Sequence, residues 1–203
     1  MALNIIFIAN PGNGKSTLLN ILCNGNCFNG GYSVGRSHVF DKRTFGDLTY
    51  MDTPGLDDVD YDNKVKACKE ISLLLKSGGN YKVIFVVGER HGRVHSHDVW
   101  TVNMVTDAVP EITANNFGVI VNQASEWTMR LPETGDGPTK TMFRAWMFHS
   151  HRTCPAAHVL FLPVIADMVD KTSASMDFAK VREHDQIKKI LKFTYGSPII
   201  NLA

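Results

Sequence analysis

A glycine-containing turn near the start of the chain lies between an apolar run and an amphipathic stretch. The apolar run ends at Ala9, and the turn leads through Gly12 and Gly14 into Lys15-Ser16, so that the segment reads LNIIFIANPGNGKST. A buried strand, a turn of this type and a helix that opens at the lysine form the context of a phosphate-binding loop. The segment therefore predicts a strand–loop–helix unit whose backbone faces a phosphate.

Short β-rich runs alternate with longer amphipathic stretches along the rest of the chain. We expect strands at Asn4–Ala9, Leu48–Asp52, Lys82–Gly88, Phe117–Asn122 and Val159–Pro163. We expect helices at Lys15–Cys23, Asn63–Lys76, His97–Val109, Thr139–His151 and Met176–Phe193. This alternation predicts an α/β protein with the three-layer P-loop NTPase fold, a mostly parallel sheet with helices on both faces.

Two further segments have their own expected structures. Val39–Phe45 is a candidate antiparallel edge strand before Leu48–Asp52. Ser125–Pro138 contains Pro132, Gly135 and Gly137 besides its terminal proline, and is expected to form a long loop.

Length, charge and cysteine content exclude several classes of protein. A chain of 203 residues suffices for one sizeable core and is too short for two ordinary domains, so we expect residues 1–203 to form a single domain. The net charge of +1 argues against a global electrostatic grip on nucleic acid or on anionic membranes. No apolar run approaches the ~20 residues of a membrane span, and the first strand leaves no room for a signal peptide, so a cytoplasmic location is expected. The four cysteines have no zinc-site spacing and are expected to be reduced thiols.

The phosphate loop carries side chains suited to phosphate and metal. The predicted binding residues are Asn10, Pro11, Gly12, Asn13, Gly14, Lys15, Ser16 and Thr17. Lys15 is expected to reach the β- and γ-phosphates, and the Ser16 hydroxyl to ligate Mg²⁺. Ala9 stands where such motifs begin with glycine, which is a mild departure because alanine has the smallest side chain with a Cβ.

A second phosphate-sensing motif, DTPGL, ends the strand Leu48–Asp52. Asp52 is positioned to hold Mg²⁺ through a water, and Gly55 to present its backbone N–H to a γ-phosphate. Lys15 and Gly55 are therefore the predicted catalytic groups. The ordinary interpretation of Pro54-Gly55 is a turn that ends the strand, but the preceding phosphate loop favours the functional one.

The motifs ANPGNGKSTLLN and DTPGLDD resemble those of P-loop GTPases of the translation-factor-related class, and within it the septin-like, immunity-associated (IMAP/Toc-type) branch. The resemblance continues to VIVNQAS and covers most of residues 1–125. It implies a protein that binds GTP and GDP with Mg²⁺, hydrolyses GTP slowly, and switches or dimerises with the nucleotide. Slow hydrolysis follows because Leu56 stands where Ras-like relatives place the glutamine that orients the attacking water.

The resemblance also implies a homodimer across the nucleotide face, in which a partner side chain assists. The residues in segments that could face such a partner are Arg36, Arg90, Arg93, His38 and His95. The alternative for each of them is an ordinary solvated surface residue. In the first switch, Ser37 is the expected Mg²⁺ ligand, with Ser33 in reserve, because no threonine falls at the position that relatives use.

Base recognition in this class uses an N/T-K-x-D motif, and here the corresponding residues are Asn122-Gln123-Ala124-Ser125. Asn122 fits the pattern. Gln123 has an uncharged stem, and Ser125 offers one hydroxyl where a carboxylate would accept two bonds, so weaker guanine selectivity is expected. A loop shifted by one residue would place Glu126 there instead, and Trp127 is either a base-stacking residue or a packing anchor.

One further residue completes the predicted nucleotide site. After the strand Val159–Pro163, Ala166 is expected to give its backbone N–H to the purine oxygen.

Two functions of different classes fit these motifs. The first is a guanine-nucleotide-binding switch with slow hydrolysis and an unknown effector protein. The second is a degenerate pseudo-GTPase that acts as a protein-interaction module, which Ala9, Leu56 and Ser125 would favour. An ATPase is a weaker third option, because the order of motifs is that of GTPases.

Overall fold

The structure is a computed structural model that describes residues 3–25, 27–28, 40–56, 61–90, 92–113, 115–133, 135, 140, 158–164 and 185–202. Its centre is a sheet with the strand order β2-β3-β1-β4-β6-β7. The parallel strands are β1 (Leu3–Ala9), β3 (Leu48–Asp52), β4 (Gly79–Arg90), β6 (Phe117–Ala124) and β7 (Val159–Pro163). β2 (Asp41–Phe45) pairs antiparallel with β3 at one edge. Two short strands, β5 (Arg93–Val94) and β8 (Ile200–Leu202), pair antiparallel with β4.

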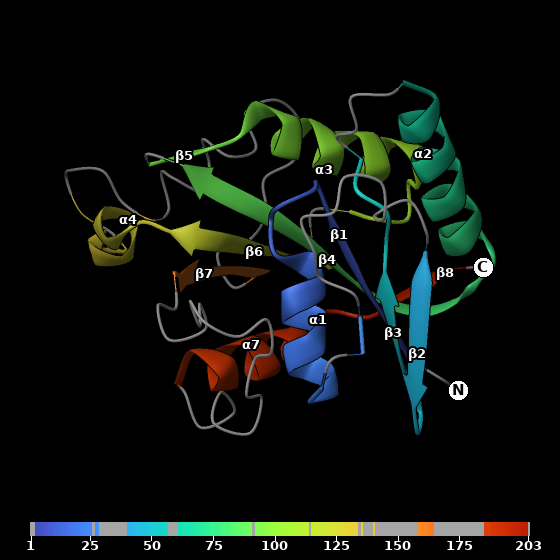
Figure 1. Ribbon diagram of the computed structural model, residues 1–203, viewed down its shortest axis with the longest axis horizontal. Helices are drawn as coiled ribbons and strands as arrows, with labels where there is room; N and C mark the ends of the chain where they lie inside the picture. Colours follow the sequence, from blue (N-terminus) through green and yellow to red (C-terminus); the bar gives the residue numbers. More distant parts are fainter. Residues whose placement is uncertain are drawn as a thin grey trace, which may run out of the picture.

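Helices cover both faces of the sheet (Figure 1). α1 (Lys15–Cys23) and α7 (Asp185–Gly196) lie below it in this view, and α2 (Tyr61–Lys76) and α3 (Ser96–Ala108) lie above it. α4 (Glu126–Arg130) is a short helix beyond the end of β6. The expected α/β fold, a mostly parallel sheet in three layers, is therefore confirmed. None of the helices in the described ranges is long and apolar enough to cross a bilayer.

The central strand β4 shows why the sheet needs a layer on each side. Val83, Phe85 and Val87 belong to the core cluster that includes residues of α2 and α3, whereas Ile84 and Val86 belong to the cluster with α1 and α7. Successive strand side chains point to opposite faces, so a run without polar residues must be covered twice. The same alternation places the Glu89 side chain, near the end of β4, on the face of Val83, Phe85 and Val87.

The element boundaries agree closely with the sequence wherever periodicity was strong. The strands Leu48–Asp52 and Val159–Pro163 and the helix Lys15–Cys23 have the expected bounds. The expected loop Ser125–Pro138 is wrong in its first part, because residues 126–130 form α4. Ser125 caps this helix by accepting a bond from Thr128 N at 3.2 Å. The predicted helix Thr139–His151 lies almost wholly outside the described residues, as does the part of Met176–Phe193 before residue 185.

A buried lysine joins the last helix to the central strand. Lys82 of β4 is 5% exposed, and its Nζ donates to Ser197 O at 2.7 Å and to Tyr195 O, which are carbonyls at the end of α7. Burial lowers the pKa of the Lys82 ammonium. The carbonyls that a helix leaves unpaired at its C-terminus favour a cation, so these bonds offset part of the cost of burying the charge.

Candidate functional site

The phosphate loop begins where β1 ends and continues into α1. Gly14 precedes the helix with a φ of 82°, a left-handed conformation that glycine adopts without strain. A Cβ at this position would lie 2.5 Å from Asn122 Nδ2. Asn122 Nδ2 donates to Asn13 O at 2.8 Å, so the end of β6 is held directly against the loop. A side chain at position 14 would break that contact as well as the turn.

The three groups predicted to serve phosphate and Mg²⁺ converge at the carboxyl ends of β1 and β3. Asp52 at the end of β3 accepts a bond from Ser16 Oγ at 2.6 Å through one carboxylate oxygen. Its other oxygen forms an ion pair with Lys15 Nζ. Both side chains of this pair remain slightly accessible, with 12% of Lys15 and 13% of Asp52 exposed. A carboxylate and a hydroxyl are the hard oxygen ligands that Mg²⁺ prefers.

The DTPG segment lies close against the phosphate loop. A Cβ on Gly55 would lie 2.6 Å from the ring carbons of Pro11, so only glycine permits this approach. Thr53 Oγ1 donates to Phe7 O at 2.9 Å and fastens the segment to β1. Leu56, the next residue, is 1% exposed and belongs to the core cluster beneath α2 and α3. Its side chain faces away from solvent.

A buried aspartate in α3, Asp98, holds the phosphate loop through hydrogen bonds to its side chains. It was not among the residues predicted from the sequence. Asp98 is 4% exposed, and its Oδ1 accepts bonds from Asn10 Nδ2 at 2.7 Å and from Asn13 Nδ2 at 2.8 Å. Its Oδ2 accepts from Gly88 N at 2.9 Å, at the end of β4. Thr101 Oγ1, one turn further along α3, donates to Asn10 Oδ1 at 3.0 Å. All three donors to Asp98 are neutral amides, so the carboxylate orders the loop by hydrogen bonding.

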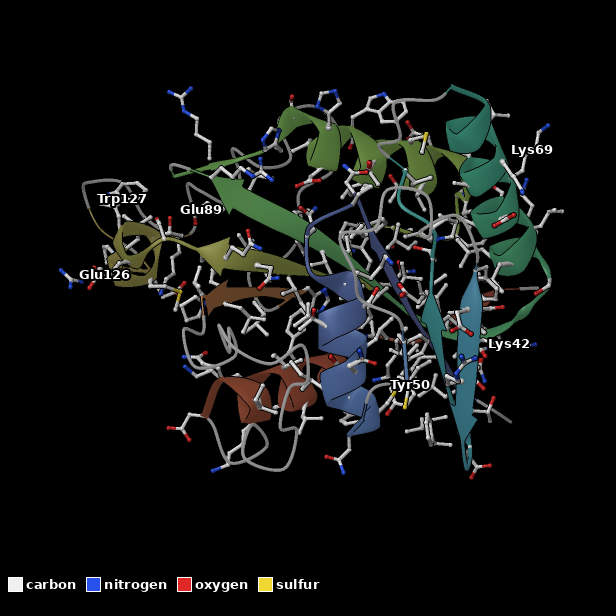
Figure 2. The ribbon with its side chains drawn as sticks, in the orientation of Figure 1. Lys42, Tyr50, Lys69, Glu89, Glu126 and Trp127 are labelled. Atoms are coloured by element: carbon white, nitrogen blue, oxygen red, sulfur yellow. The ribbon has the colours of Figure 1, made fainter. Side chains whose placement is uncertain are left out.

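The base loop, defined as residues 122–125, is held by a different acid. Gln123 adopts a left-handed φ of 60° and is exposed. The Ser125 hydroxyl caps α4, and its oxygen also lies 3.1 Å from Thr128 Oγ1. Ser125 N donates to Glu89 Oε2 at 3.2 Å. In Figure 2, Glu89 lies at the tip of β4, on the same side of the molecule as Glu126 and Trp127 of α4.

The structure brings together most of the predicted site residues from elements far apart in the chain. Lys15, Ser16 and Asp52 converge, Gly55 lies against Pro11, and Asn122 lies against Asn13. Glu126 points away from this group, because it is 79% exposed and pairs with Arg130. Ser37 and Ala166 lie outside the described residues, as do Arg36 and His38. The sequence offered little signal for Asp98, since an acidic residue in the first turn of a helix is common.

Comparison with solved structures finds proteins of similar fold. Toc33 from Arabidopsis thaliana, crystallised as a dimerisation-deficient mutant, superposes with a TM-score of 0.61 at 15% identity, over 100% of this chain and 88% of that one. Toc33 in complex with GDP and Mg²⁺ gives a TM-score of 0.59 at 15% identity, over the same shares of the two chains. Its complex with Mg²⁺ and GMPPNP gives 0.56 at 16% identity, covering 98% and 87%. No protein-family model and no curated protein sequence matches this chain.

These likenesses confirm the expected α/β fold of P-loop NTPases. At this level of identity they do not separate the IMAP or septin-like branch from the Toc type. A metal site built by protein side chains alone is not found, since no group of three or more His, Cys, Asp or Glu in the described ranges could hold a metal. Mg²⁺ bound by one or two protein oxygens together with substrate phosphates needs no such group.

The cysteines near the end of α1 behave as ordinary thiols. Burial and the neighbouring Cys27 raise the pKa of Cys23 to about 12. A thiol that stays protonated at neutral pH is a poor metal ligand and a poor nucleophile. Asn20 fixes the chain just beyond these residues, with its Oδ1 accepting from Phe28 N at 2.7 Å and its Nδ2 donating to Phe28 O at 2.8 Å.

Replacing Asp98 tests whether its carboxylate orders the phosphate loop. In Asp98→Asn, the new amide must face either Gly88 N–H or the amides of Asn10 and Asn13, so a buried donor loses its acceptor. We expect the free energy of unfolding in urea to fall by about 1–3 kcal/mol. Hydrogen exchange of the backbone amides in residues 10–15 should also accelerate.

The matched control is Asp107→Asn, which changes an exposed aspartate at the other end of the same helix. Equal stability and equal exchange in the two variants would contradict the role of Asp98.

Proposed function

We propose that this chain is a guanine-nucleotide-binding G domain of the IMAP/Toc type that binds GTP and GDP with Mg²⁺ and hydrolyses GTP slowly. One observation carries the proposal: Lys15, Ser16 and Asp52 meet where β1 and β3 end, with Gly55 beside the same loop. This is the set of groups that a triphosphate and its metal require.

Each residue has a defined part in the proposed reaction. Backbone N–H groups from Asn10 to Lys15 surround the β-phosphate, and Lys15 neutralises the β- and γ-phosphates. Ser16 directly, and Asp52 through a water, would hold Mg²⁺, which would supply positive charge to the phosphate oxygens. Gly55 N–H senses the γ-phosphate, and the γ-phosphate thereby favours one arrangement of the switch segments, for which Ser37 is the proposed first-switch ligand.

The residues proposed to contact the base are weaker evidence for guanine than the residues around the phosphates are for a triphosphate. Asn122 holds the phosphate loop, and Gln123 can lay its stem along a purine ring. The Ser125 hydroxyl is already bonded within α4, so it adds little to base recognition. Ala166 N–H is the proposed donor to the purine oxygen. Guanine over adenine selectivity should therefore be lower than in relatives that have an aspartate at this position.

The alternative is a degenerate pseudo-GTPase that acts as a protein-interaction module, and the contacts of the phosphate half do not favour it. Ala9, Leu56 and Ser125 are the residues that argue for it. Ala9 is 1% exposed, ends β1 within the core and causes no break in the loop. Position 56 is where Ras-like relatives place the glutamine that orients the attacking water. Leucine there therefore bears on the rate of hydrolysis and leaves phosphate binding intact.

Lys15→Ala tests the nucleotide site. We expect GDP affinity in the presence of Mg²⁺ to fall about 100-fold or more, because the charged donor to the phosphates is lost. Titration with fluorescently labelled GDP measures the change, and chromatography of nucleotide released from denatured wild-type protein identifies the ligand.

Lys42→Ala is the control, since Lys42 is an exposed lysine on the edge strand β2. Unchanged GDP affinity in Lys15→Ala would refute the assignment of the site.

Leu56→Gln tests why hydrolysis is slow. Because Leu56 is buried in the core, the glutamine amide would be buried there as well. We expect a loss of about 2–4 kcal/mol in the free energy of unfolding, with no gain in the rate of GTP hydrolysis.

Leu73→Gln, at a leucine that is 70% exposed on α2, should change neither quantity. An accelerated hydrolysis in Leu56→Gln would show that position 56 reaches the attacking water after all.

Dimerisation across the nucleotide face is the remaining part of the proposal. Arg90 and Arg93 face each other in the β4–β5 hairpin, and both are exposed at the same end of the sheet as the phosphate loop. Two guanidinium groups there can reach the phosphates of a second copy. We expect the double variant Arg90→Ala/Arg93→Ala to remain monomeric by light scattering with a GTP analogue, under conditions where wild type dimerises.

Arg43→Ala on the edge strand β2, which β3 and β1 separate from β4, is the control and should dimerise as wild type does. A monomeric wild type with every nucleotide would remove dimerisation from the proposed function.

A further inference from the structure

The last buried residue of β4 is an acid where the strand's pattern calls for an apolar side chain. Val83, Phe85 and Val87 precede Glu89 at two-residue steps and all face the cluster under α2 and α3. Glu89 continues this row and is 4% exposed. Burial of an isolated carboxylate costs several kcal/mol unless it is paired and hydrogen-bonded, so a glutamate at this point needs a physical reason.

The bonds of Glu89 connect it to the base loop. Its Oε2 accepts from Ser125 N at 3.2 Å, and its Oε1 is buried with no hydrogen-bond partner among the described residues. Within the described part of the chain, no lysine, arginine or histidine forms an ion pair with it. The Trp127 ring lies 3.7 Å from the place of a Cβ on Gly92, so α4 packs against the β4–β5 hairpin. The Glu89 carboxyl group is therefore buried directly beside residue 125, with one oxygen bonded to Ser125 N.

Among the acids that the structure describes at this end of the sheet, Glu89 alone has that position. Ser125 carries no charge, and its hydroxyl is bonded within α4. Glu126 is 79% exposed and pairs with Arg130, so solvent screens its charge. Asp98 is bonded to the phosphate loop.

We propose that Glu89 is a positioning and specificity-determining residue for the base, supplying from β4 the negative charge that the base loop lacks at Ser125. This proposal rests on the proposed nucleotide site. A buried charge acts through a medium of low effective permittivity and is felt further than a surface charge. It favours a purine edge with N–H donors, such as guanine N1–H and its amino group, over adenine, whose N1 is an acceptor. The ligand class that the site selects is thus a 6-oxopurine nucleotide.

Glu89→Gln tests this with minimal change in shape, because the amide oxygen can still accept from Ser125 N while the charge is lost. GDP and ADP are titrated separately with Mg²⁺ into wild type and variant, and the ratio of the two dissociation constants is compared. We expect the preference for GDP over ADP to fall roughly tenfold, mostly through weaker GDP binding. Glu126→Gln, which removes the exposed neighbouring acid, should leave the ratio unchanged.

The outcomes separate the role of Glu89 from the existence of the nucleotide site. A loss of affinity that is equal for GDP and ADP, or no loss, would overturn the role of Glu89 while leaving the nucleotide site in place. Absence of GDP binding in the wild type would overturn this inference and the proposed function together.

A second variant keeps the test decisive if Glu89→Gln lowers the melting temperature. Ser125→Asp restores an acid to the base loop, but in the wild type the new carboxylate lies beside Glu89 and the two repel. We expect Ser125→Asp to raise the preference for GDP more in the Glu89→Gln background than in the wild type. An equal rise in both backgrounds would show that the two positions are independent and would refute the proposal.

Discussion

Hydrogen bonds to the Asp98 carboxylate join the phosphate loop to α3 and to the end of β4. The backbone N–H groups of a phosphate-binding loop point toward the phosphate. The polar side chains of the loop must therefore find their hydrogen-bond partners in other elements of the fold. Asp98 provides such a partner from α3 by accepting from Asn10, from Asn13 and from the end of β4. Three neutral amide groups, two from the phosphate loop and one from β4, thus share one buried carboxylate, and both of its oxygens are hydrogen-bonded.

The two halves of the site differ in how complete they are. On the phosphate side, the lysine, hydroxyl and carboxylate converge, and two glycines permit contacts that any Cβ would block. On the base side, Asn122 keeps its structural bond, whereas Ser125 has become a helix cap. Phosphate binding depends mostly on backbone geometry, whereas base discrimination depends on a few side chains. Base discrimination can therefore change while phosphate binding is kept.

The strand–loop–helix unit of the proposed phosphate side could be predicted from the sequence, because its signal lies in eight consecutive residues between a strand and a helix. Elements with strong periodicity, such as Lys15–Cys23, were also placed correctly. Asp98 and Glu89 were not predicted, since each acts on residues that only the folded sheet brings near; Asp98 and Asn10 are 88 positions apart. α4 was missed because the glycines and prolines that follow it outweighed the capping signal of Ser125.

Both buried acids lie on one short stretch of chain, the last residue of the core part of β4 and the first turn of α3. Glu89 accepts a hydrogen bond from the base loop, and Asp98 accepts hydrogen bonds from the phosphate loop. A displacement of this stretch would loosen both loops at once, and the bond from Asn122 Nδ2 to Asn13 O joins the two loops to each other as well. Exchange of a bound nucleotide would then proceed as a single opening event with one rate constant, and any protein that pulls on the β4–α3 connection would act as a release factor without touching the nucleotide.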